Sequence, residues 1–198
     1  METKDNVLAI HAKKRRDWRK WLEKNHETEK AVWLIMYNKT STTESINYEE
    51  AVEEALCFGW IDSKAVKRDD ESRYQYFAKR KPKSNWSKPN KLRVEKMTSQ
   101  GLMTASGQKL IDLAKATGTW DALNDADNNV IPADLQALLN DNDIARKNFE
   151  AFSTSSKRII LEWIQAAKRP ETREKRIKET VELAEKNIRA HFPLNEKK

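Results

Sequence analysis

The chain is organised around a basic segment that reads Lys79-Arg80-Lys81-Pro82-Lys83-Ser84-Asn85-Trp86-Ser87-Lys88-Pro89-Asn90. Extended to residue 96, this basic segment (residues 79–96) holds eight Lys or Arg residues and one acid, Glu95, which gives it a net charge of +7. That value equals the formal charge of the whole chain of 198 residues. Several cations this close together reinforce the local potential, so the segment predicts a surface that meets an anion.

The elements on either side of the basic segment define a small sheet with helices. Residues 60–67 and 73–79 predict a hairpin, and the apolar run 31–37 predicts a third strand that is covered on both faces. Asn47-Tyr48-Glu49-Glu50 matches a capping box, and it opens a helix that Gly59 is placed to end. Ser87 and Pro89 predict the start of another helix, which runs to about residue 99.

The rest of the chain is predicted to be helical, apart from a loose tail at residues 1–10. Helices are expected at 12–25 and 107–116, and a polar stretch at 121–132 is the best linker candidate. Four more helices are expected at 132–140, 144–152, 155–168 and 171–190. We therefore predict an α+β protein in which a small, mainly antiparallel sheet packs with helices and an all-helical subdomain follows. The expected domains are 1–125 and 126–198.

Composition favours a folded protein with heavily charged outer faces. Charged residues make up 35% of the chain and hydrophobic residues 38%, while seven tryptophans supply apolar area that must be buried. Cys57 is the single cysteine, which rules out an intramolecular disulfide and fits a reducing compartment. The sequence shows no secretory signal and no membrane span, so we expect a cytoplasmic location.

Three motifs resemble the bacterial YdeI/OmpD-associated (OmdA-like) family of bacteriocin-protection proteins. The first is Glu54-Ala55-Leu56-Cys57-Phe58-Gly59-Trp60-Ile61-Asp62-Ser63. The second is Arg80 to Asn90 of the basic segment, together with Arg93-Val94-Glu95. The third is a helical set that consists of Pro132-Ala133-Asp134-Leu135, Phe152-Ser153, Ser155-Ser156, Trp163-Ile164-Gln165-Ala166-Ala167-Lys168-Arg169-Pro170-Glu171-Thr172-Arg173 and Arg176-Ile177. The resemblance implies resistance to bacteriocins or cationic antimicrobial peptides and association with an outer-membrane porin, with no catalytic residues. Two features depart from it: no signal leads to the periplasm, and Phe77-Ala78 stands where relatives are expected to carry Thr-Pro before the Arg.

From the residues and the resemblance together we expect a non-enzymatic, stress-related binding protein with an anionic partner, which is a protein, a nucleic acid or a small molecule. Positive charge does not suit direct capture of a cationic peptide, so any role in peptide resistance is expected to be indirect. Asp62 is expected to pair with Arg80 or Arg93. The predicted contact residues are Trp60, Asp62, Arg80, Lys81, Lys83, Ser84, Trp86, Asn90, Arg93, Lys168, Arg169 and Arg173.

No catalytic residue, cofactor or metal site is predicted. The three histidines (His11, His26 and His191) are scattered, Cys57 lies among apolar neighbours, and there is no phosphate-binding glycine loop. The oligomeric state is left open.

Three alternatives remain. The basic segment would bind nucleic acid if Trp86 stacked on a base. A metal-handling protein with a YdhG-like or frataxin-like fold would hold iron at Glu49, Glu50, Glu53 and Glu54. An enzyme would need a pocket beside Trp60 and Trp86 that gathers Asp62 and Arg80. A buried Trp86 would make the basic segment a scaffold with a basic rim, and an exposed one would make it a binding site.

Overall fold

The computed structural model of the protein describes residues 2–192. It divides into two compact units, Met1–Asp121 and Ala122–Lys198, and each is described by itself. The fold is α+β with a helical C-terminal part, as the sequence predicted.

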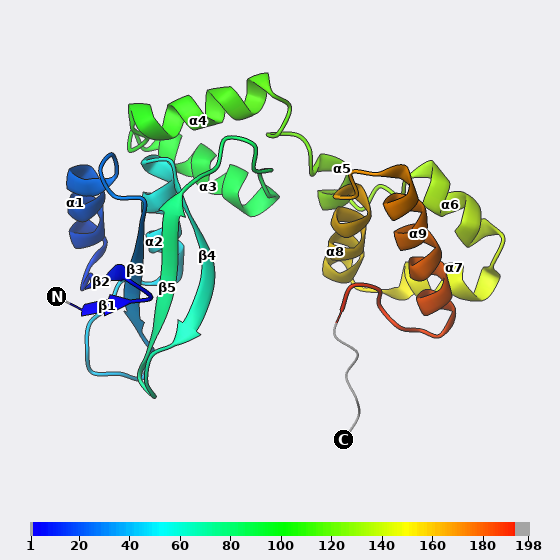
Figure 1. Cartoon of the computed structure of the whole chain (residues 1–198), viewed down its shortest axis with the longest axis horizontal. Coiled ribbons are helices and arrows are strands. Elements are labelled where there is room, and N and C mark those ends of the chain that lie inside the picture. Colours follow the sequence, from blue (N-terminus) through cyan, green and yellow to red (C-terminus); the bar gives the residue numbers. More distant parts are fainter. Residues whose placement is uncertain (1, 193–198) are drawn as a thin grey trace. The chain divides into compact units, whose positions relative to one another are not determined.

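A five-stranded sheet forms the centre of the described part of the N-terminal unit (Figure 1). The strand order is β1-β2-β3-β5-β4. β2 and β3 run parallel, and the other neighbouring pairs are antiparallel, including the predicted hairpin of β4 and β5. The strands are β1 (Glu2–Lys4), β2 (Val7–His11), β3 (Ala31–Tyr37), β4 (Trp60–Lys67) and β5 (Ser72–Lys79).

The first two strands correct the prediction of a loose tail at residues 1–10. Asp5 and Asn6 both have positive φ angles, of 51° and 60°, and they form the two-residue turn of a hairpin. Such turns match the twist of antiparallel strands and accept Asp and Asn readily. Leu8 and Ile10 then pack against the main core while Ala9 faces the other side of the sheet, and this alternation fixes β2 in place.

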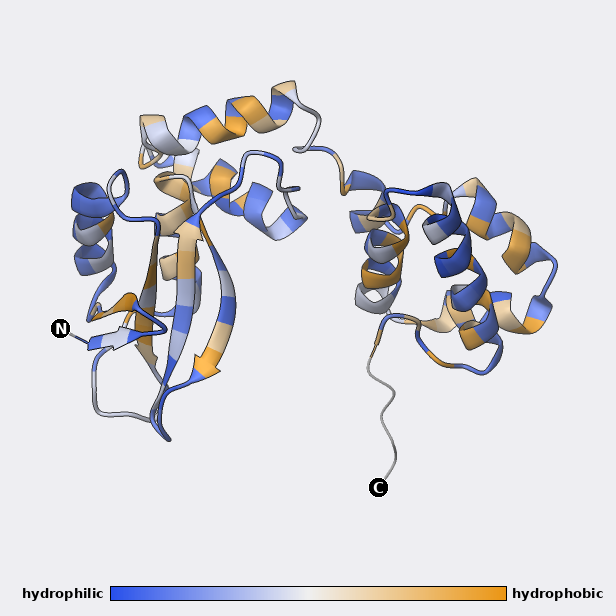
Figure 2. Ribbon diagram, in the orientation of Figure 1, coloured by the Kyte–Doolittle hydropathy of each residue, from blue (hydrophilic) through white to orange (hydrophobic). Residues whose placement is uncertain are grey.

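β3 is buried on both faces, which explains its unbroken apolar run. Val32, Leu34 and Met36 belong to the core between the sheet and the helices, and Trp33 and Ile35 belong to a smaller cluster on the opposite face. Every member of that smaller cluster comes from a strand. Figure 2 shows β3 as one of the most hydrophobic strands of the unit.

The helices of the N-terminal unit supply the rest of its main core. Trp18 and Leu22 of α1 are fully buried, and α2 packs against α1, α3, α4 and β4. The predicted start of α2 is confirmed, because the Asn47 side chain accepts a hydrogen bond of 2.9 Å from the Glu50 amide. The helices are α1 (Arg15–Asn25), α2 (Tyr48–Cys57), α3 (Lys88–Ser99) and α4 (Ala105–Ala116).

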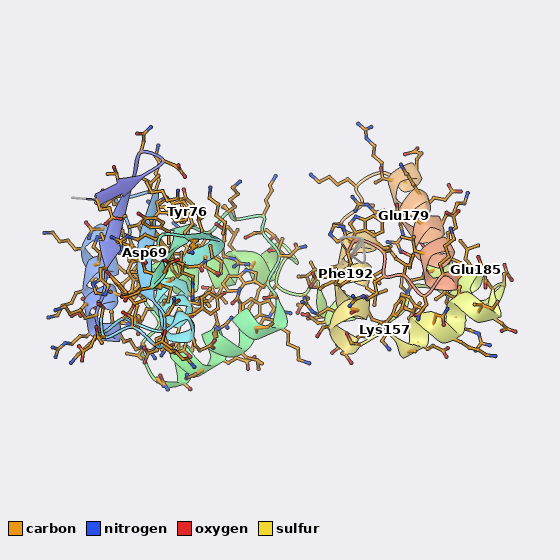
Figure 3. The ribbon with its side chains drawn as sticks, turned by 90° about the horizontal axis from the view of Figure 1, so that it is seen from below. Asp69, Tyr76, Lys157, Glu179, Glu185 and Phe192 are labelled. Carbon is orange, nitrogen blue, oxygen red and sulfur yellow. The ribbon has the colours of Figure 1, made fainter. Side chains whose placement is uncertain are left out.

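The C-terminal unit consists of helices and connecting loops, without a strand in its described residues, and has a core of its own. Leu135, Phe149, Ile160 and Ile164 are buried at its centre, and Figure 3 shows charged side chains such as Glu185 projecting from its surface. A short helix occupies part of the predicted linker. The helices are α5 (Asn124–Asp127), α6 (Ala133–Asn140), α7 (Asp143–Ala151), α8 (Thr154–Gln165) and α9 (Pro170–Glu185). Among residues 2–192, no helix has the length and apolar character needed to cross a bilayer.

Candidate functional site

Gly59 sets the geometry at the point where α2, β4 and the basic segment meet. Its φ of +74° ends α2, and its carbonyl accepts a 2.9 Å hydrogen bond from the amide of Arg80. A Cβ atom at this position would lie 2.9 Å from Leu110 Cδ1 on α4. Glycine is therefore required both for the turn and for the close approach of α4. The hairpin register pairs Trp60 with Lys79, so the basic segment leaves the sheet directly beside Gly59.

Trp86 is part of the core, with only 2% of its surface exposed. Its backbone amide donates to Thr119 O at 3.2 Å, and its ring lies 5.1 Å from that of Trp120. The Arg80 guanidinium lies 3.8 Å from the centre of the Trp86 ring. The alternative in which Trp86 stacks on a base does not fit, because protein groups cover this ring. The buried Trp86 corresponds to the expected case of a scaffold with a basic rim. Trp60 is likewise fully buried, and its indole N–H donates to His26 O at 3.2 Å.

Arg80 is a buried cation without a carboxylate partner. It is 7% exposed, its Nη2 donates to Asn85 O, and its Nε has no hydrogen-bond partner within residues 2–192. Burial lowers the pKa of Arg80 to about 10, with Asp62 attracting its charge from a distance. The guanidinium is therefore still charged at neutral pH. A buried charge is costly unless it is paired or hydrogen-bonded, and the groups that hold this guanidinium in the described chain are the carbonyl of Asn85 and the Trp86 ring.

A groove of about 380 Å³ lies beside Arg80 and brings three cations together. Lys79 and Lys109 are exposed at this groove, and the Lys79 ammonium also donates to Glu27 O at 2.6 Å. Glu27 is the one acid among the lining residues. This cavity is called the Arg80 groove, and it is lined by His26, Glu27, Phe58, Gly59, Trp60, Lys79, Arg80, Ser106, Lys109 and Leu110.

α4 brings Ser106 into the Arg80 groove because the start of this helix is held against the end of α2. Thr104 Oγ1 donates to Cys57 O at 2.6 Å and caps the amide of Gly107. A Cβ atom at Gly107 would come within 2.3 Å of Cys57 O, so only glycine permits this approach. Ser106 lies between Thr104 and Gly107, and its Oγ is 3.0 Å from Nε2 of His26.

The expected pairing of Asp62 with an arginine is wrong. Asp62 accepts hydrogen bonds from the Tyr48 hydroxyl at 2.8 Å and from Gln75 Nε2 at 3.5 Å. Burial and the Asp62 carboxylate raise the pKa of Tyr48 to about 12. Asp62 does not line the Arg80 groove. Its partners come from α2 and β5, which neither the spacing nor the charge pattern of the sequence could indicate.

Three further predicted contact residues of the basic segment, Ser84, Asn90 and Arg93, have hydrogen-bond partners inside the protein. Arg93 makes a bidentate pair with Glu49 at 2.7 and 2.8 Å, and it also donates to Asn90 Oδ1 at 2.8 Å. Ser84 Oγ donates to the carbonyl of Lys81 at 2.7 Å. Lys81 and Lys83 are exposed and have no ion pair within the described chain.

The acidic helix α2 does not supply a metal site. Glu53 and Glu54 are 1% and 2% exposed, and their oxygens are taken by cations. Arg15 donates to both carboxylates at 2.6 and 2.8 Å, Arg19 donates to Glu54 at 2.7 Å, and Lys96 pairs with Glu53. No group of three or more potential metal ligands occurs within residues 2–192. The alternative of an iron site at these glutamates is therefore wrong.

The remaining predicted contact residues belong to the C-terminal unit. Arg173 forms a bidentate pair with Asp134 at 2.6 and 2.9 Å, and this guanidinium holds the pKa of Asp134 below its usual value. Lys168 and Arg169 are exposed at the start of α9. Arg173 also lines a small cavity of about 150 Å³ between α5 and α8.

Of the twelve predicted contact residues, Trp60 and Arg80 line the Arg80 groove. Sequence reasoning missed His26, Ser106 and Lys109, because they come from helices far apart in the chain. The position of Lys79 at the groove could have been predicted from the sequence, because the predicted hairpin places it opposite Trp60.

Two family models match the chain, one in each unit. Residues 10–110, just over half of the chain, match the model of a family described as a domain of unknown function (DUF8412). Residues 128–187 match the family model described as bacteriocin-protection, YdeI or OmpD-associated (OmdA). Neither a curated protein nor a solved structure matches the chain. Of the three motifs that resemble the OmdA-like family, the helical set lies within the OmdA match, whereas those at 54–63 and 80–95 lie within the DUF8412 match. The chain therefore belongs to the DUF8412 family and carries an OmdA domain in its C-terminal unit.

Proposed function

We propose that the protein is a stress-related binding protein that takes an anionic ligand in the Arg80 groove. The observation that carries this proposal is the buried Arg80, which has an unpartnered Nε and no carboxylate counter-ion in the described chain. A carboxylate or phosphate oxygen is the natural partner of such a group, because charge-assisted hydrogen bonds to guanidinium are among the strongest in proteins. Lys79 and Lys109 add positive charge at the same groove.

This proposal changes the role of the basic segment. Arg80 replaces Trp86 as the central contact, and Lys81 and Lys83 contribute positive potential from outside the Arg80 groove. The family name connects the OmdA domain with protection against bacteriocins. A cationic groove does not suit direct capture of a cationic peptide, so we infer that any protective effect follows indirectly from binding the anion.

Nitrogen-15 NMR of the full chain tests the proposal at the proposed contact itself. Inorganic phosphate and succinate are titrated separately against the labelled protein at constant ionic strength, with chloride as the compensating ion. We expect a saturable shift of the Arg80 Nε–Hε signal and of the Gly59 amide for at least one of these anions. Shifts that are absent, or that spread without saturation over all lysine-rich positions, would overturn the proposal.

Two matched variants locate the site. Arg80→Met keeps an unbranched side chain of somewhat shorter length but removes its charge, and it should abolish the saturable shift of Gly59. Lys83→Met removes one charge from an exposed position of the same segment and should leave that shift in place. Equal effects of the two variants would show a general response to charge and no binding site at Arg80.

A further inference from the structure

His26 and Ser106 form a hydrogen-bonded pair although they are 80 positions apart in the sequence. Ser106 Oγ lies 3.0 Å from His26 Nε2, and His26 Nδ1 lies 2.9 Å from the carbonyl oxygen of Leu22. A carbonyl oxygen can only accept a hydrogen bond, so Nδ1 carries the proton of the neutral ring. Nε2 is then the acceptor for the Ser106 hydroxyl. This is the tautomer that a general base needs beside a serine nucleophile.

Both side chains are held by their surroundings. The His26 ring lies 5.1 Å from that of Phe58, and the backbone carbonyl of His26 accepts the indole N–H of Trp60. Ser106 stands in the first turn of α4, which the Thr104 cap and the close approach of Gly107 fix against α2. The base is thus oriented by a third group, as in hydrolases that use a serine and a histidine.

The Arg80 groove also offers positive charge for a developing oxyanion. The amides of Ala105 and Ser106 are at the positive end of α4 and have no hydrogen-bond partner within residues 2–192. Arg80 is among the residues that line the same groove, and its charge raises the positive potential there. Glu27 Oε1 lies 3.8 Å from His26 Nε2, where it attracts the imidazolium that a proton transfer would form. Donors placed where charge develops are a major source of catalysis.

We propose that Ser106 and His26 form a catalytic pair that hydrolyses small carboxylic esters bearing an anionic group. The anionic part of this substrate class rests on the proposed function of the Arg80 groove. The volume of about 380 Å³ has room for the acyl part of a small ester.

The reaction proceeds in two steps. Ser106 Oγ bonds to the acyl carbon while its proton passes to His26 Nε2, and the bond from the acyl carbon to the alcohol oxygen breaks as Nε2 returns the proton to that oxygen. Water then attacks the acyl-serine and gives a proton to Nε2. Nε2 passes the proton to Oγ, which releases the carboxylic acid and restores the serine. Water is the co-reactant, and no oxidant or reductant is consumed.

A neutral alkyl fluorophosphonate tests the pair without requiring anion binding. Ser106 Oγ displaces fluoride from phosphorus, which forms a P–O bond and leaves a stable adduct that mass spectrometry assigns to a peptide. We expect labelling of Ser106 in the full-length protein, none at this position in Ser106→Ala, and unchanged labelling in the control Ser84→Ala. His26→Asn keeps an amide near the position of Nδ1 and should label at least 100-fold more slowly, the usual range for loss of a general base.

Thermal unfolding of each variant separates loss of chemistry from loss of fold. Ser106→Ala places a good helix former in the first turn of α4, so we expect it to fold. If His26→Asn is unfolded, the comparison of wild type with Ser106→Ala still shows whether Ser106 is the labelled residue. The inference is overturned if folded wild-type protein does not label at Ser106, or if folded His26→Asn labels at the wild-type rate. If labelling fails while the NMR shifts at Arg80 persist, anion binding stands and catalysis falls.

A pair of activated esters tests the substrate class. The mono-4-nitrophenyl ester of succinic acid should be hydrolysed with a higher kcat/KM than 4-nitrophenyl butyrate, its uncharged counterpart. Arg80→Met should remove this preference. Equal kcat/KM values for the two esters in the wild-type protein would contradict the anionic specificity.

Discussion

The substitution Arg80→Met should leave the protein almost as stable as the wild type while it removes anion binding. The magnitude follows from the environment of the guanidinium. Burial lowers the pKa of Arg80 from 12.5 to about 10. At about 1.4 kcal/mol per pKa unit, holding the charged form in this environment costs about 3 kcal/mol.

Two contacts of Arg80 offset that cost. Its charged hydrogen bond to Asn85 O contributes about 2 kcal/mol, and its stacking on Trp86 contributes about 1 kcal/mol. Methionine keeps much of the contact with the Trp86 ring and carries no charge. The gains and losses nearly cancel, so we expect the free energy of unfolding to change by no more than about 1 kcal/mol.

Urea denaturation followed by circular dichroism measures the stability, with Lys83→Met as the matched control. Phosphate and succinate titrations of the same samples should show at least a tenfold loss of affinity in Arg80→Met, because truncating one partner of a close charged contact costs about 2 kcal/mol or more. A loss of stability above about 3 kcal/mol would mean that Arg80 is a structural group whose charge is already satisfied. Unchanged affinity would refute the assignment of the anion contact.

Three further results are expected. Glu54→Gln should unfold at a lower urea concentration, with a loss of about 3 kcal/mol by circular dichroism, because it removes the buried charge that pairs with both Arg15 and Arg19. A loss no larger than that of Glu50→Gln would contradict this. Tyr48 should titrate near pH 12 in ultraviolet absorbance. Since the pKa of Tyr48 in the folded protein lies above the ordinary value of 10, the free energy of unfolding should fall as the pH rises from 10 to 12. Tyr48→Phe should reduce this fall. An identical pH profile in the variant would show that another group is responsible. Cys57 is fully buried with a pKa raised to about 11, so a thiol reagent at pH 8 should react only after denaturation, and rapid reaction of the native protein would contradict the burial.

Local patterns in the sequence predicted most elements of the N-terminal unit. The apolar run of β3, the cap at Asn47 and the turn at Gly59 each depend on neighbouring residues, and each is found where it was expected. The β1–β2 hairpin was missed because its strands are short and its turn is Asp5-Asn6, without glycine. Here the pairing of β2 with β3 stabilises a segment whose own signal is weak.

The candidate site could be predicted only in part, because its members meet through long-range packing. Trp86 is an example. Its ring is covered by Trp120, which follows α4 in the chain, and by Arg80, which precedes Trp86 by six positions. His26 and Ser106 carry no shared motif, and their contact exists because α4 returns to the end of α2 at Gly107. Charge counting identified Arg80 but not the groove beside it.

The nucleic-acid alternative depended on eight cations acting together, and the structure divides them among different roles. Arg93 and Lys96 pair with glutamates of α2, Arg80 is buried against Trp86, and Lys79 donates to a backbone carbonyl. Lys88 and Lys91 also have interaction partners.

Eight phosphate contacts would give a slope of log affinity against log salt of roughly −6 for a single strand, at about −0.7 per contact. Lys81 and Lys83, the two cations of the segment without partners in the described chain, would give only about −1.4. Such a weak dependence is far from that of a nucleic-acid surface. Two of the eight cations, Arg93 and Lys96, join α3 to α2, and this division of roles is the reason why we propose a small anion and not a polyanion as the ligand.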